Sequence, residues 1–176
     1  MQPRFAQRVQ AAGAALVAAG LVGCGGGVAA DRAHPTPANA DREWIANASG
    51  VIDQLDTDVS AATPAGRDLA AARRALRDES DLYGLLVAYT DFGGCSKMIG
   101  GIGEAPVRFR GVLRELSAAC GRFERGATLF TRAASQHDAR SLLAASRQVK
   151  SAAALLYRAV LRLAAARTGS SGAATS

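Results

Sequence analysis

The sequence is short of the residues from which β-strands are built. Aromatic residues make up 5% of the 176 residues, and there are no long runs of β-branched or aromatic side chains. Alanine dominates the hydrophobic 49%, and alanine and arginine are both strong helix formers. The composition therefore predicts an all-α protein with a core of alanine, leucine and valine.

Metal and haem ligands are also scarce. The two histidines are His34, in a Pro-containing stretch, and His137, between two expected helices, and no His-Glu-x-x-His, Glu-x-x-His or Cys-x-x-Cys-His sequence occurs. A haem held by Met98 and His137 is conceivable, but a solvated turn is the favoured interpretation of His137. We expect no metal and no cofactor.

Motifs of catalysis are missing as well. Gly101-Ile102-Gly103 follows no expected strand and precedes no Gly-Lys-Ser/Thr, so it is interpreted as a turn rather than a phosphate loop. The acidic groups do not follow the alternating spacing of a calcium loop and are expected on solvated helix faces. They are Asp53, Asp56, Asp58, Asp78, Glu79 and Asp81. We expect no catalytic residues and a non-enzymatic protein.

The N-terminus has the pattern of an export signal. Arg4 and Arg8 precede an apolar run, residues 9–21, which ends in Leu21-Val22-Gly23-Cys24. This tetrapeptide resembles the bacterial lipobox, and the resemblance implies cleavage before Cys24, a diacylglyceryl group on its sulfur and acylation, typically with palmitate, of the new N-terminus. An uncleaved anchor or an ordinary signal peptide cut elsewhere are the alternatives, although several glycines and a short apolar run disfavour the anchor.

These features divide the chain into four parts. Residues 1–23 are expected to be the signal peptide, 24–40 a flexible tether of roughly 20 Å reach, 41–167 one helical domain, and 168–176 a disordered tail. Four stretches of the domain carry helical spacing, so an antiparallel up-down four-helix bundle is expected. Their expected starts are Asp41 as an N-cap, Thr63-Pro64, Pro106, and Asp138 as an N-cap.

Three cysteines become an even number if Cys24 carries lipid. Cys95 and Cys120 would then form a disulfide in an oxidising compartment, with two buried free thiols as the alternative. Cys120 falls on the apolar face of the third expected helix, about four turns from its start. The Gly-rich connector, residues 93–103, would therefore have to fold back along this helix.

Charge is distributed unevenly along the chain. Residues 24–100 carry seven basic and eleven acidic side chains, whereas residues 101–176 carry twelve basic and four acidic ones. Arginines are expected to face solvent on the third and fourth helices, either as ordinary solvated faces or as a contact for an anionic surface. They are Arg110, Arg114, Arg125, Arg132, Arg140, Arg147, Arg158 and Arg162. Anionic lipid or an acidic wall polymer suits an exported protein better than nucleic acid, for which interleaved aromatic residues are missing.

The expected domain also loosely resembles uncharacterised helical lipoproteins of high-GC bacteria. The likeness lies in Gly93-Gly94-Cys95, Ala105-Pro106 and Ala118-Ala119-Cys120, and it implies no activity. We therefore expect an extracytoplasmic protein, lipid-anchored to the bacterial cell membrane, that binds through its helical surface. The alternative is an extracytoplasmic small-ligand or metal binder with a cavity between the helices.

Overall fold

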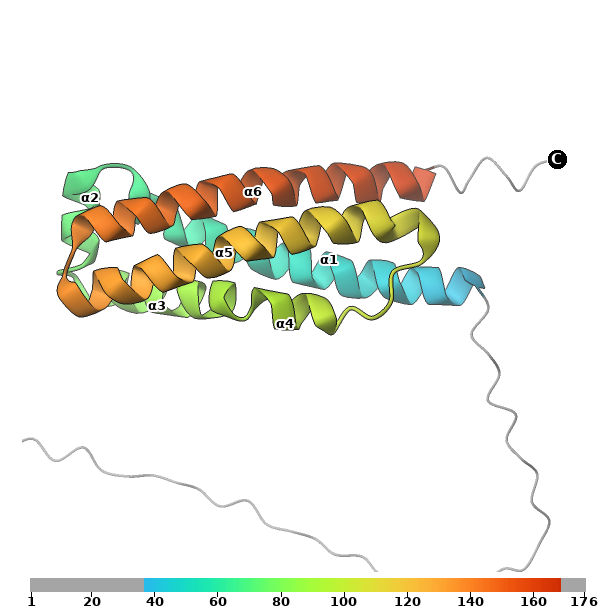
Figure 1. Cartoon of the computed structure of the whole chain (residues 1–176), viewed down its shortest axis with the longest axis horizontal. Coiled ribbons are helices and arrows are strands. Elements are labelled where there is room, and N and C mark those ends of the chain that lie inside the picture. The colour runs from blue at the N-terminus through green and yellow to red at the C-terminus, as the bar shows by residue number, and fades with distance from the viewer. Residues whose placement is uncertain (1–36, 169–176) are drawn as a thin grey trace, which may run out of the picture. The chain divides into compact units, whose positions relative to one another are not determined.

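The computed structural model describes residues 37–168, and all regular structure in this range is helical (Figure 1). The all-α prediction is therefore confirmed for the described part of the chain. Its α-helices are α1 (Pro37–Ala62), α2 (Leu69–Ala75), α3 (Glu79–Gly93), α4 (Cys95–Gly100), α5 (Arg110–Gln136) and α6 (Ala139–Thr168). Two short 3-10 helices, η1 (Pro64–Gly66) and η2 (Val107–Phe109), precede α2 and α5.

The long helices α1, α5 and α6 run lengthwise with α6 packed against both α1 and α5, and α3 and α4 follow each other nearly in line (Figure 1). The η1 and α2 segment lies at the end where α5 turns into α6. The first residue of α1 and the last residue of α6 lie at the opposite end. There the Arg167 guanidinium donates a hydrogen bond to the Ser49 hydroxyl over 3.0 Å.

The first helix begins at Pro37, so residues 37–40, which were expected in the tether, are helical. Asp41 is consequently not an N-cap, and its carboxylate pairs with Arg108 instead. On the buried face of α1, Trp44 is buried and the adjacent Ile45 only partly buried.

The second expected helix is broken into three pieces. The Thr63 hydroxyl donates to the Val59 carbonyl and caps nothing, and Pro64 opens only the short η1. Asp68 and Asp78 each start a new helix, because their side chains accept hydrogen bonds from the backbone N–H of Ala71 (2.7 Å) and Asp81 (2.9 Å). The Ala71 bond also lowers the pKa of Asp68.

The turn between α5 and α6 follows the sequence-based expectation. Asp138 caps α6, since its carboxylate accepts from the backbone N–H of Arg140 (2.9 Å) and Ser141 (3.2 Å). The Ser141 hydroxyl is the main cause of the lowered pKa of Asp138. His137 ends α5 in the left-handed conformation, with φ at 50°.

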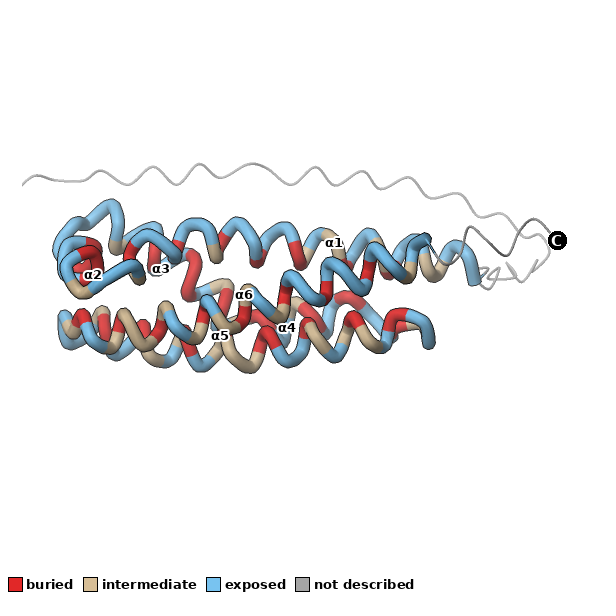
Figure 2. The backbone as a smooth tube through the Cα atoms, turned by 90° about the horizontal axis from the view of Figure 1, so that it is seen from above, coloured by how far each residue is buried: buried red, intermediate tan, exposed pale blue. Residues whose placement is uncertain are grey.

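The core combines a few aromatic contacts with close alanine packing. Tyr89 stacks on Phe130 with ring centroids 4.3 Å apart, and Phe92 stacks on Phe123 at 4.5 Å, so α3 is joined to α5 by rings. Eight of the sixteen buried residues of α5 and α6 are alanine, glycine or cysteine, and Figure 2 shows the buried positions on the sides where the helices face one another. Gly126 of α5 lies close to the backbone of α6, because a Cβ at this position would be 3.4 Å from the Ala145 carbonyl oxygen.

Gly66 sets how closely η1 approaches α6, which makes it a test of this packing. A Cβ at Gly66 would overlap the Ser146 side chain, so Gly66→Ala should lower the free energy of unfolding by about 1–3 kcal/mol. Gly50→Ala is the matched control, because nothing lies within 4 Å of a Cβ there and the change should add about 0.5–1 kcal/mol. Thermal melts of both variants check this, and equal shifts of one sign would contradict it.

Candidate functional site

The two described cysteines lie together in the core. Cys95, the first residue of α4, and Cys120, in the middle of α5, are fully buried with Cα atoms 5.2 Å apart and their sulfurs joined as a disulfide. The connector lies along α5 as expected, but it does so as α4, which continues the course of α3 rather than folding back from a turn. The Ser96 N–H donates to the Glu124 carboxylate over 3.0 Å and holds the start of α4 to α5.

Oxidation of this pair in the exported protein is a prediction. A bridge with a sequence separation of 25 should stabilise the folded state by about 3–4 kcal/mol in the chain-entropy model. Peptide mass mapping without reductant should find the two cysteine peptides linked, and Cys95→Ala with Cys120→Ala should melt well below the oxidised protein. Two alkylatable thiols in protein taken from the envelope would contradict the prediction.

Cys24 and its lipobox-like sequence lie outside the described residues, as do the expected signal peptide and most of the expected tether. Of the expected tail, Thr168 is helical as the last residue of α6, and residues 169–176 lie outside the described part. Lipidation of Cys24 accordingly stays a prediction.

All eight arginines expected to face solvent are exposed. The four on α5 lie opposite its buried face. On α6 the stripe is turned towards α5, because Arg158 and Arg162 both approach Glu115, with N–O distances of 3.5 and 3.4 Å. Both guanidinium groups keep more than half of their side-chain surface exposed, so this shared carboxylate offsets only part of their charge.

The acidic and basic residues, which are unevenly distributed along the chain, lie on different helices. Counted from their sequences, α1 carries one basic and five acidic side chains and α3 carries three acidic ones and no basic one. By the same count, α5 carries five basic and two acidic side chains, and α6 carries six basic and no acidic one. Since α1 packs with α3, and α5 packs most extensively with α6, the molecule has an acidic side and a basic side.

One acidic residue departs from the expected solvated faces. Asp58 lies on the buried side of α1 and keeps only 4% of its surface exposed. The Gln54 side-chain amide donates to both Asp58 oxygens, at 3.4 and 3.2 Å, and to Asp91 of α3 at 3.2 Å. Burial raises the pKa of Asp58, the Gln54 hydrogen bond opposes this, and the Asp91 carboxylate raises it further. The sequence contained a signal for this burial, because Asp58 lies three residues after Leu55 and four before Ala62, which are both on the buried face of α1.

Neutralising Asp58 should therefore stabilise the protein. Because the pKa of Asp58 is raised by folding, the folded state loses its proton at a higher pH than the unfolded state, and this group's contribution to stability falls as pH rises above its ordinary value of 3.8. Asp58→Asn should raise the free energy of unfolding at pH 7 by about 1 kcal/mol and have little effect near pH 3. Urea unfolding at both pH values measures the difference.

Asp56→Asn, at an exposed position of the same helix, is the control and should change stability at neither pH. Destabilisation by Asp58→Asn at pH 7 would show that the charge is required in the fold.

Three buried side-chain atoms in the described part have no hydrogen-bond partner: Trp44 Nε1, Tyr89 Oη and Gln148 Oε1. Burial is the main cause that raises the pKa of Tyr89 to about 12. The phenol is therefore neutral at physiological pH and unsuited to act as a base.

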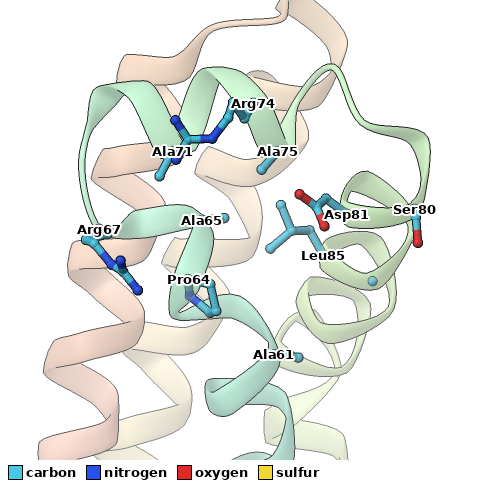
Figure 3. A pocket seen from close by; sticks show the side chains of 11 residues that line it. Ala61, Pro64, Ala65, Arg67, Ala71, Arg74, Ala75, Ser80, Asp81 and Leu85 are labelled. Atoms are coloured by element: carbon cyan, nitrogen blue, oxygen red, sulfur yellow. The ribbon is translucent and has the colours of Figure 1, made fainter.

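A hollow of about 350 Å³ lies between η1, α2 and α3 (Figure 3). Alanines and Leu85 form much of its lining, and Arg67, Arg74, Ser80 and Asp81 supply its polar groups. A small molecule with one charge of each sign would suit this lining. A larger hollow of about 810 Å³ lies between α3 and α5, so the alternative function, binding of a small ligand, has more than one candidate hollow in the described part of the chain.

Within residues 37–168, no group of three or more histidine, cysteine or acidic side chains is arranged to hold a metal ion. None of the helices in this range combines the length and the hydropathy that a membrane crossing requires. No protein-family model, curated protein or solved structure matches the chain.

Proposed function

We propose that this chain is a lipid-anchored protein of the bacterial envelope that binds an anionic surface through its basic side and catalyses no reaction. Cys24 carries the lipid in this proposal, and the twelve residues 25–36 join it to the start of α1. Even fully extended, twelve residues span at most about 40 Å, so α5 and α6 remain close to the headgroups. The four rods α1, α3–α4, α5 and α6 serve as an up-down four-helix bundle that presents this side.

The observation that carries the proposal is the adjacency of two cationic helices with their arginines exposed. Each basic side chain near an anionic leaflet contributes only about 1 kcal/mol, and the attraction decays over about 10 Å. A tether supplies the proximity that this weak attraction needs. An acidic wall polymer offers the same charge, and anionic lipid is the first surface to test because the anchor would hold the protein against it.

The anchor is tested by Cys24→Ser. The substitution removes the sulfur that would carry the lipid, so the protein should be released from membranes or accumulate with its signal attached. Membrane fractionation and intact mass measure both effects. Unchanged fractionation together with an unchanged mature mass would contradict lipidation.

The charged contact is tested by replacing Arg125, Arg132, Arg147 and Arg158 with Gln in the mature chain carrying Cys24→Ser. The unsubstituted chain should co-sediment with anionic vesicles at low salt and dissociate by about 0.3 M NaCl, because salt shortens the range of the attraction. The quadruple variant should lose this binding and keep its melting temperature, since all four side chains are exposed.

The matched control replaces Arg67, Arg73, Arg74 and Arg77 with Gln. These arginines are also exposed but lie around η1 and α2, so the control removes the same charge from another place. It should weaken the binding less than the quadruple variant, because η1 and α2 are short and lie at one end of the long helices. Equal losses of binding in the two variants would show that binding depends on the net charge of the protein and not on the position of the arginines. Binding of the unsubstituted chain to neutral vesicles would contradict an electrostatic contact.

A further inference from the structure

A second stripe on α6, distinct from its arginines, is apolar and exposed. Tyr157, Val160 and Leu161 keep 64%, 38% and 51% of their surfaces exposed, and the neighbouring Ala154 and Ala164 are exposed too. Their spacing of three and four places them on one outer side of the helix. We call these five residues the outer α6 stripe.

The same side of α6 is covered in its N-terminal half. There η1 and α2 pack on α6, and Gly66 lies against Ser146. Tyr157 follows Ser146 by eleven residues, about three helical turns, so both point in nearly the same direction. The apolar side therefore continues beyond the α2 segment, and none of the described helices covers it there.

Charge decides which kind of surface fits the stripe. It is flanked by Arg147, Lys150 and Arg158, and α6 contains no acidic residue. A comparable exposed cluster on α3, Tyr83, Leu86 and Val87, lies on a helix with three acidic residues and no basic one. An anionic surface would therefore attract the first cluster and repel the second.

The position along α6 fits as well. The stripe lies in the half of α6 nearest to the start of α1, from which the chain leads back to Cys24 (Figure 1). A helix that combines an apolar face with flanking basic residues and a tyrosine is suited to the boundary between lipid headgroups and acyl chains. There the tyrosine ring is buried while its hydroxyl stays hydrated.

We propose that the outer α6 stripe inserts shallowly into the headgroup boundary of an anionic bilayer, with the flanking Lys and Arg side chains at the phosphates. This rests on the proposed membrane anchorage and specifies how the protein lies: on α6, with its helices along the membrane plane. The arginines of α5 are then held beside the contact rather than at its centre.

The test attaches the mature chain to vesicles through Cys24, using a maleimide lipid, because Cys95 and Cys120 are fully buried. Two variants exchange one exposed tyrosine for tryptophan, Tyr157→Trp in the stripe and Tyr83→Trp on α3, and the unsubstituted chain reports the background of buried Trp44. Vesicles with brominated acyl chains should quench the added tryptophan of Tyr157→Trp, and its emission should shift to the blue. Tyr83→Trp should be unaffected, and neutral lipid should reduce the quenching at residue 157.

Covalent attachment separates this inference from the proposed function, since it holds the protein at the membrane whether or not Cys24 is naturally lipidated. If the untethered chain binds vesicles but the added tryptophan of Tyr157→Trp is not quenched, the arginine contact is supported and insertion of the stripe is contradicted. Equal quenching of the two variants would overturn it also.

Tyr157→Ser with Leu161→Ser should weaken binding of the untethered chain to anionic vesicles about ten-fold. The same pair, examined by sedimentation of the protein alone, tests a second copy as the occupant. A dimer that these substitutions abolish would assign the outer α6 stripe to self-association and contradict the membrane contact.

Discussion

The structure depends on packing two cationic helices, α5 and α6, directly against each other. Like charges oppose this contact, and their repulsion is limited because the arginines of α5 lie opposite its buried face while small residues meet within the interface. Gly126 lies against Ala145 and Val149, and buried alanines on both helices let the backbones approach closely. Glu115, shared by Arg158 and Arg162, adds a bridge across the two helices. The same packing that forms the core gathers the basic residues on one side.

The remaining elements are arranged around this pair. Stacked rings join α3 to α5, and the Cys95 and Cys120 bridge holds α4 against the middle of α5. The η1 and α2 segment packs on α6 but covers only its N-terminal half. An uncovered apolar stripe therefore remains at the other half, on the helix that carries the most positive charge. In the proposed account the bilayer covers this stripe, and the acidic α3, which does not pack on α6, lies away from it.

Much of this could be predicted from the sequence, because long amphipathic helices follow a regular spacing. The helical class, the approximate extents of α5 and α6, the Asp138 cap and the exposure of the arginines all follow from it. Local capping was harder to predict, since Asp68 and Asp78 break a continuous apolar pattern by binding backbone N–H groups. Asp58 was misplaced because acidic side chains were assigned to solvated faces, although its spacing from Leu55 and Ala62 puts it on the buried side of α1. The outer α6 stripe was not recognised, since its exposure depends on where the η1 and α2 segment ends on α6.

The central claim is that the protein lies on α6, with its basic side towards an anionic membrane. The axes of the long helices are roughly aligned. The tilt of the described domain can therefore be measured from the dichroism of its amide I band in polarised infrared spectra of oriented anionic bilayers. The account predicts helices close to the membrane plane when the chain is attached through Cys24, and loss of this order at about 0.5 M NaCl. Helices aligned with the membrane normal, or a random orientation at low salt, would contradict it.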